Sequence, residues 1–182
     1  MLLAGGIMPV GANAVTAEPG SRVARQESRL ATGGYHTLQI RSDGTLWAWG
    51  RNGSGRLGLG DTTDRTSPVQ VGSDTDWVSV SAGDSHTLGI RSDGTLWAWG
   101  RNSYGRLGLG DTTDRTSPVQ VGSATGWVSV SAGDYHTLGV RSDGTLWAWG
   151  RNGSGRLGLG DTTDRTSPVQ VGSDTDWVSV SA

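Results

Sequence analysis

Three histidines recur at the same place in a repeated sequence and are the first candidates for chemistry. His36, His86 and His136 are each followed by Thr-Leu and lie fifty residues apart. Imidazole nitrogens are common zinc ligands, so three converging histidines would form a metal site. Equivalent positions in the separate repeats of a ring lie apart, however. We therefore expect each histidine to bond neighbouring backbone at the start of a strand, and we predict no metal site.

Two other patterns are typical of cofactor binding or catalysis. Residues 53–58 spell the dinucleotide fingerprint Gly-x-Gly-x-x-Gly, but that motif requires a following helix, and residues 103–105 of the second copy break it with Ser-Tyr-Gly. Ser42, Asp43 and His36 are the residue types of a catalytic triad, yet the serine has no nucleophile elbow around it. Without Lys or Cys there is no Walker lysine, thiolate or disulfide. We predict a protein that is not an enzyme, with no catalytic residue and no cofactor.

Paired aspartates in two of the copies are candidates for binding calcium. The pairs are Asp74 with Asp76 and Asp174 with Asp176. The middle copy has Ala124 and Gly126 at these positions, and two carboxylates alone are too few ligands for the ion. We therefore expect a turn that leads into the next strand.

Arginine and aspartate also recur in a long loop of each copy. The arginines are Arg56, Arg106 and Arg156, and the aspartates are Asp61, Asp111 and Asp161. We expect them to form loop ion pairs, each of which contributes little to stability.

An eleven-residue stretch organises the chain around these candidates. Ser-Asp-Gly-Thr-Leu-Trp-Ala-Trp-Gly-Arg-Asn occupies residues 42–52, 92–102 and 142–152. Asp-Gly is typical of a tight turn, and the following residues alternate with the period of a strand. The stretch predicts the turn and second arm of a β-hairpin, with both tryptophans on one face.

Each fifty-residue unit contains four strand-like segments and no apolar pattern with the period of a helix. In the second unit these segments are residues 77–82, 86–91, 95–100 and 118–121, with a long loop at 101–117. Four short strands at this period predict a blade of a β-propeller. A β-solenoid is the alternative, although its coils usually have shorter periods.

The fold class is therefore all-β: three propeller blades of four antiparallel strands, plus one extra strand, as a partial propeller. The units span residues 29–82, 83–132 and 133–182. The first unit opens with a degenerate strand at residues 29–33, and the extra strand runs from Trp177 to Ala182. An unpaired edge strand invites pairing with another chain, so we expect a homo-oligomer in which residues 177–182 complete the first blade of a second copy. Two chains would then close a ring of six blades.

The first 28 residues lie outside the repeats. Residues 1–17 resemble a signal peptide that has lost its basic start, the alternative being a leader without function, and residues 18–28 are predicted to be a linker. We expect a secreted or cell-surface protein, with a cytoplasmic location as the alternative. The apolar part is too broken by Gly and Pro for a transmembrane helix. The net charge of −2 gives no case for binding nucleic acid or a membrane surface.

The paired tryptophans have two interpretations. They are Trp47 with Trp49, Trp97 with Trp99, and Trp147 with Trp149. Packing between neighbouring blades is favoured over a sugar-stacking platform, because a propeller needs large side chains in that wedge.

The unit resembles the regulator of chromosome condensation repeat. The resemblance rests on residues 133–138 (Gly-Asp-Tyr-His-Thr-Leu), 142–152 and 155–160 (Gly-Arg-Leu-Gly-Leu-Gly), and it extends over residues 30–182. It implies a propeller, usually of seven blades, that presents loops from a rigid ring to a protein partner. We therefore predict a non-enzymatic interaction module; the alternatives are a carbohydrate-binding propeller and a truncated fragment without independent function.

Positions that differ between copies are where we expect partner contacts. Between the last two units the pairs are Ser85/Tyr135, Ile90/Val140, Ser103/Gly153, Tyr104/Ser154, Ala124/Asp174 and Gly126/Asp176. The predicted partner-binding residues are Tyr104, Tyr135, the two aspartate pairs, and Arg56, Arg106 and Arg156. The partner itself is an unidentified protein.

Overall fold

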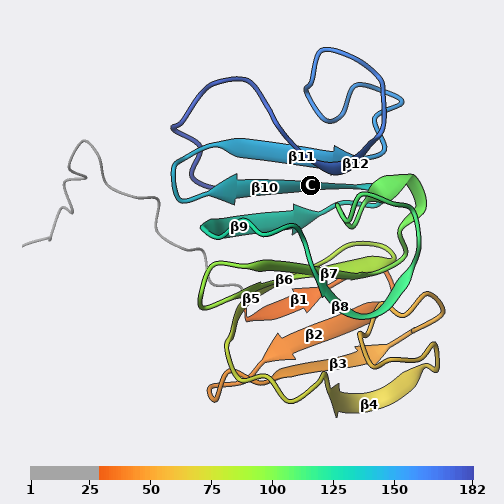
Figure 1. Ribbon diagram of the computed structural model, residues 1–182. Coiled ribbons are helices and arrows are strands. Elements are labelled where there is room, and N and C mark those ends of the chain that lie inside the picture. Colours follow the sequence, from red (N-terminus) through yellow and green to blue (C-terminus); the bar gives the residue numbers. More distant parts are fainter. Residues whose placement is uncertain (1–28) are drawn as a thin grey trace, which may run out of the picture.

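The computed structural model describes residues 29–182 and consists of three four-stranded antiparallel sheets, one for each unit (Figure 1). The first blade comprises β1 (Leu30–Thr32), β2 (His36–Ile40), β3 (Leu46–Gly50) and β4 (Arg65–Gln70). The second comprises β5 (Trp77–Ala82), β6 (His86–Arg91), β7 (Leu96–Gly100) and β8 (Arg115–Gln120). The third comprises β9 (Trp127–Ala132), β10 (His136–Arg141), β11 (Leu146–Gly150) and β12 (Arg165–Gln170). Strands follow one another in sequence order within each sheet, which confirms the predicted all-β blades.

The repeated eleven-residue stretch forms the predicted hairpin. In the second blade β6 and β7 pair from His86 opposite Gly100 to Ile90 opposite Leu96. Gly94 closes the turn with a φ of +82°, a conformation that glycine adopts without steric cost. The Asp93 carboxylate accepts hydrogen bonds from the backbone and the hydroxyl of Thr95, which fixes the turn.

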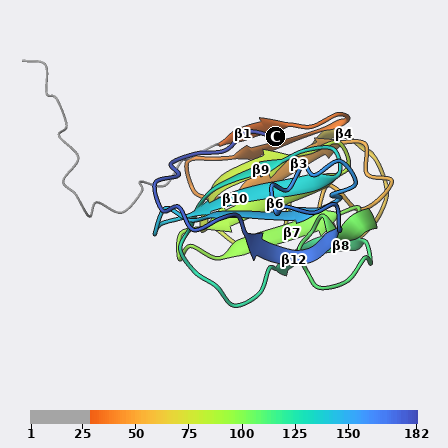
Figure 2. The same ribbon diagram turned by 90° about the horizontal axis from the view of Figure 1, so that it is seen from above.

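The fourth strand of each blade begins earlier than predicted. β8 starts at Arg115, whereas the sequence predicted a start at Pro118. Proline has no N–H to donate, but an outer edge strand accommodates it because only one side of that strand is paired. The connection before β8 contains one short 3₁₀ helix, η1 (Ser103–Gly105), which lies at the right-hand end of the strands in both Figure 1 and Figure 2.

The core lies between the blades. The opening strands β1 and β9 each contact β5, and the three strands line a pocket of about 200 Å³. In the first interface, between the first and second blades, Leu38 and Leu46 pack against Trp77 and Trp99. In the second interface, between the second and third blades, the corresponding side chains are Leu88, Leu96, Trp127 and Trp149. Trp99 and Trp149 are fully buried, which supports the interpretation that tryptophans fill the wedge between blades.

A glycine of the preceding blade allows the rings of Trp99 and Trp149 to lie against its backbone. A Cβ added to Gly58 would lie 2.8 Å from Trp99 Nε1, and one added to Gly108 would lie 2.8 Å from Trp149 Nε1. Both distances are too short for any side chain, so packing requires glycine at positions 58 and 108.

The two end segments differ from a regular blade. The opening strand of the first unit, predicted to be degenerate, is a strand of three residues paired with β2. The extra strand predicted at residues 177–182 takes the position of the opening strand of a further blade. Ala182 N donates to Ser131 Oγ at 2.8 Å, just as Ala132 N donates to Ser81 Oγ at 3.0 Å. It forms no ladder, because no hairpin among the described residues lies next to it.

Predictions for residues 1–17 and 18–28 fall outside the described residues. Within residues 29–182, no helix has the length and apolar character needed to cross a membrane.

Candidate protein-interaction face

The loops of the blades gather at the two opposite ends of the strands. One end carries the turns after the first strands and the long loops after the third strands; we call it the tyrosine face. The other end carries the Asp-Gly turns and the connections between blades, and we call it the aspartate face. The hairpin register sets this division, since His86 and Gly100 meet at one end of the hairpin and Ile90 and Leu96 at the other.

Tyr104 and Tyr135 meet on the tyrosine face, although they come from different blades. Their rings make an edge-to-face contact with centroids 6.1 Å apart. Both remain partly accessible, with 41% and 37% of their surfaces exposed. The Arg151 guanidinium lies 5.0 Å from the centre of the Tyr104 ring, and that of Arg106 lies 5.0 Å from the Tyr135 ring. The structure thus brings together the two tyrosines that the sequence predicted as partner-binding residues.

The backbone of Tyr104 is strained. Its φ is +65°, and it is the single non-glycine residue with a positive φ among residues 29–182. Residues other than Gly, Asn and Asp rarely adopt a positive φ, and such outliers tend to mark functional positions. Tyr35 adds a third ring to this face, 59% exposed and 5.4 Å from the Arg51 guanidinium.

Arg56 and Arg106 are buried, and each forms a hydrogen bond to the next blade. Arg56 donates to the backbone oxygen of Asp84 at 2.9 Å, and Arg106 donates to that of Asp134 at 2.6 Å. The predicted ion pairs of these arginines with the loop aspartates are wrong. The carboxylates pair instead with the arginine four residues further on, in the pairs Asp61–Arg65, Asp111–Arg115 and Asp161–Arg165. Arg156 is exposed.

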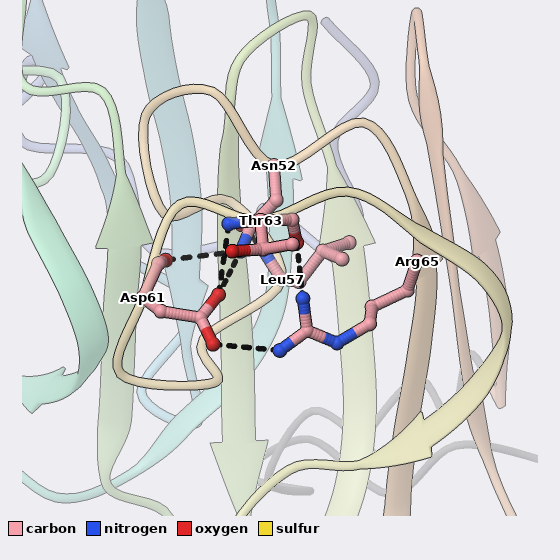
Figure 3. A network of polar contacts seen from close by, with 5 residues as sticks. All are labelled: Asn52, Leu57, Asp61, Thr63 and Arg65. Carbon is pink, nitrogen blue, oxygen red and sulfur yellow. Dashed lines mark hydrogen bonds and ion pairs between the residues drawn. The ribbon is translucent and has the colours of Figure 1, made fainter.

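A buried asparagine organises each long loop, and sequence analysis did not single it out. Asn52 donates to the backbone and the carboxylate of Asp61 and accepts from Leu57 N at 2.9 Å (Figure 3). Asp61 in turn accepts from Thr63 N and pairs with Arg65. Asn102 and Asn152 make the same contacts. The sequence did indicate this asparagine, because the Trp-Gly-Arg-Asn ending is identical in all three copies.

His36 and His86 each bond a threonine of the next blade. His36 Nε2 lies 2.9 Å from Thr87 Oγ1 of the next blade, and that hydroxyl donates to the backbone oxygen of Arg56. Because the single hydroxyl proton is used in this way, His36 Nε2 carries a proton and donates. The expected bond to backbone is therefore a bond to a side chain. Burial lowers the pKa of His36 to about 4 and lowers that of His86 well below its usual range. Among residues 29–182, no cluster of His, Asp and Glu could hold a metal.

The aspartate pairs are not near the tyrosines. Asp74 and Asp76 lie on the aspartate face, where both contact Arg91. Asp174 and Asp176 are exposed on the same face. Of the predicted partner-binding residues, the structure groups Tyr104, Tyr135 and Arg106, and it separates the aspartates from them.

Models of the Regulator of chromosome condensation (RCC1) repeat match residues 43–90, 93–140 and 143–182, and a second model of the repeat matches residues 28–56, 77–106 and 127–156. The chain belongs to the RCC1-repeat family. The resemblance predicted from the Gly-x-x-His and Gly-x-Leu-Gly motifs is confirmed.

Relatives in sequence and in structure agree with this assignment. The chain is 43% identical to the ultraviolet-B receptor UVR8 of Arabidopsis thaliana over 58 residues, which are 31% of this chain and 13% of the receptor. It is 45% identical to human Protein RCC2 over 47 residues, 26% of this chain and 9% of that protein. Among solved structures, yeast RCC1 (Prp20) bound to Kap60 superposes with a TM-score of 0.73 at 24% identity, over 81% of this chain and 37% of that chain. Human WBSCR16 gives a TM-score of 0.71 at 24% identity, over 81% and 38%. The chain thus matches less than two fifths of each of these proteins.

Proposed function

We propose that this chain is a protein-interaction module that binds its partner through the tyrosine face. The observation that carries the proposal is the accessible pair Tyr104–Tyr135 with Arg151 beside both rings, at 5.0 and 5.4 Å. Tyrosine and arginine are enriched at the energetic centres of protein interfaces, because each combines a large contact area with a polar group.

The scaffold under this face supports the proposal. Arg56 and Arg106 tie the first and second long loops to the next blade, and Asn102 closes the loop that carries Tyr104. A loop held in this way loses little conformational entropy when a partner binds. Related propellers also act through protein contacts: yeast RCC1 (Prp20) was solved bound to Kap60, and Prp20p of Saccharomyces cerevisiae was described with its binding to Gsp1p and histones.

The carbohydrate-binding alternative has no such support. Trp99 and Trp149 are fully buried between blades, and an arginine already lies over the half-buried rings of Trp47, Trp97 and Trp147.

The proposal is tested by placing a photo-crosslinking amino acid at Tyr35 on the tyrosine face and, as the matched control, at Asp174 on the aspartate face. Both positions are exposed, and neither belongs to the core. We expect defined adducts with one cellular protein from position 35 and none from position 174. A protein that is crosslinked from position 174 and not from position 35 would contradict the proposal.

We also propose that chains associate through residues 177–182. Trp177 and Val178 are 39% and 65% exposed, and the segment lies where an opening strand would pair with a hairpin. The first blade of a second chain would supply that hairpin by strand addition, with residues 177–182 replacing the three-residue strand β1 beside β2. Light scattering of the full chain should give a dimer, and deletion of residues 177–182 should give a monomer. An unchanged mass after the deletion would contradict this mode of assembly.

A further inference from the structure

Because the repeats are nearly identical, the two grooves between blades can be compared position by position. On the aspartate face of the first interface, Arg91 stacks over Trp97 with its guanidinium carbon 4.0 Å from the ring centre. Two carboxylates of the blade connection neutralise this cation: Asp74 contacts it directly, and Asp76 Oδ1 lies 3.7 Å from its Nε. The charge of Arg91 is thus neutralised by carboxylates of its own chain.

In the second interface the same arginine lacks both carboxylates. Arg141 stacks over Trp127 and Trp147 at 5.3 and 5.1 Å, but Ala124 and Gly126 replace the two aspartates. Within residues 29–182, Arg141 forms no ion pair.

The two connections nevertheless share one backbone hydrogen bond. Ser142 N donates to the oxygen of Gly126 at 2.7 Å, and Ser92 N donates to that of Asp76 at 2.8 Å. The nearby Asp143 carboxylate is bound by Thr145 through its backbone N and its hydroxyl, at 3.1 and 2.7 Å. The grooves therefore differ in side-chain charge and, at this acceptor residue, in backbone conformation, because Gly126 has a φ of +92° whereas Asp76 has no positive φ.

A pocket of about 400 Å³ opens beside Arg141. Its apolar wall is formed by Leu109, Val119, Val121, Trp127, Trp147 and Pro168. The charged residues that line it are both arginines, and one of them, Arg115, already pairs with Asp111. The volume lies in the range of small-molecule sites, which combine apolar walls with a few polar groups.

We propose that this pocket binds a small carboxylic acid with an aromatic or other apolar body. Its carboxylate would meet Arg141 as Asp74 meets Arg91, and its apolar body would pack on the half-buried Trp147 and the rest of the apolar wall. A charge-assisted hydrogen bond to a guanidinium that is already stacked and partly desolvated is stronger than one in water. Arg141 lies at the end of the strands opposite to the tyrosine pair, and the proposal does not depend on the proposed protein partner.

The first test titrates the full chain with 3-phenylpropionate in a calorimeter, with the uncharged 3-phenylpropanamide as the matched probe. We expect one site per chain with a dissociation constant on the order of 1 mM or below. The amide should bind at least tenfold more weakly, because it cannot form the ion pair. A chain that shows no saturable binding, or that binds both probes equally, would overturn the proposal.

The second test uses the chain's own difference between grooves. Ala124→Asp gives Arg141 the carboxylate that Arg91 has, and it should weaken binding of 3-phenylpropionate at least tenfold with an unchanged melting temperature. Asp74→Ala with Asp76→Gly gives the first groove the composition of the second, and it should raise the number of sites from one to two. Undiminished binding by Ala124→Asp, or a single site in the double variant, would overturn the proposal.

Discussion

The first and second interfaces share every buried contact described above. In each, a histidine bonds the threonine of the next blade, an arginine bonds a backbone oxygen across the gap, and a glycine admits a tryptophan. The residues are His36–Thr87 and His86–Thr137, Arg56–Asp84 and Arg106–Asp134, and Gly58–Trp99 and Gly108–Trp149. These residues maintain the stack of blades, whichever pair of blades they join.

The rims of the two interfaces differ on both faces. On the tyrosine face, Tyr104 and Tyr135 of the second interface replace the two serines of the first. On the aspartate face, Ala124 replaces Asp74 and leaves Arg141 beside an open pocket. The comparison teaches that amplification of one repeat supplies the scaffold, and that a few rim substitutions at the second interface supply its distinctive chemistry.

The largest expected effect is on the shared core. Trp99→Ala and Trp149→Ala each remove a fully buried ring, and each should cost about 3–5 kcal/mol in the free energy of unfolding. Urea denaturation measures both. The two losses should agree within about 1 kcal/mol, given the usual dependence of such losses on the site. A loss confined to one variant would show that the interfaces are not equivalent.

Acid should weaken both interfaces through their buried histidines. Burial lowers the pKa of His36 to about 4, so the unfolded chain binds a proton at higher pH than the folded chain does. The stabilisation is complete above pH 6.5, the ordinary pKa of histidine, and is lost as the pH falls toward 4. The loss is about 1.4 kcal/mol per pH unit, or roughly 3 kcal/mol over this window for His36.

Unfolding measured at pH 7, 6, 5 and 4.5 tests this prediction. The control is His36→Gln, whose unfolding should depend less steeply on pH in the same window. The loop aspartates do not confuse the result, because hydrogen bonds lower the pKa of Asp61 below its usual range and its contribution is lost at more acid pH. Equal slopes for the two proteins would show that His36 does not titrate on unfolding.

Converting the tyrosine rim to its counterpart in the first interface should have a small effect on folding. Tyr104→Ser with Tyr135→Ser removes one exposed edge-to-face pair, which contributes about 0.5–1.5 kcal/mol. Serine keeps the Cβ that makes a positive φ unfavourable, so the backbone strain at position 104 stays the same. Thermal unfolding should therefore change little. A loss above about 3 kcal/mol would assign these rings to the scaffold rather than to recognition.

The smallest effect is expected for the surface ion pairs that repeat in all three loops. Arg115→Ala removes the 2.6 Å contact to Asp111, whose carboxylate side chain is 42% exposed. Exposed pairs contribute about 0–1 kcal/mol. Urea denaturation should place Arg115→Ala within that range, with Arg65→Ala as its counterpart in the first blade.

The sequence was sufficient for the blades, because a period-two pattern, an Asp-Gly turn and a fifty-residue repeat are local signals. It misplaced β8, since Pro118 looks like the start of a strand when the bulge that pairs Gly100 with Arg115 is unknown. It also paired Arg56 with the wrong group. That side chain reaches across to Asp84, and a contact between blades leaves no trace in local spacing.

The candidate site was predicted in part. Comparison of the copies found Tyr104 and Tyr135, but only the fold shows that they touch and that the aspartates lie on the other face. The Arg141 pocket could not be predicted. It depends on the absence of carboxylates at Ala124 and Gly126, and only the fold shows that this connection lies beside Arg141.

The central claim is that recognition resides on the tyrosine rim of the second interface. The measurement that tests it most directly is the affinity of the crosslinked partner, once purified, for the full chain and for Tyr104→Ser/Tyr135→Ser. We predict that the double variant binds at least thirtyfold more weakly, the loss of about 2 kcal/mol that marks an interface hot spot, while its melting temperature stays close to that of the parent. Undiminished affinity in the folded double variant would contradict the account.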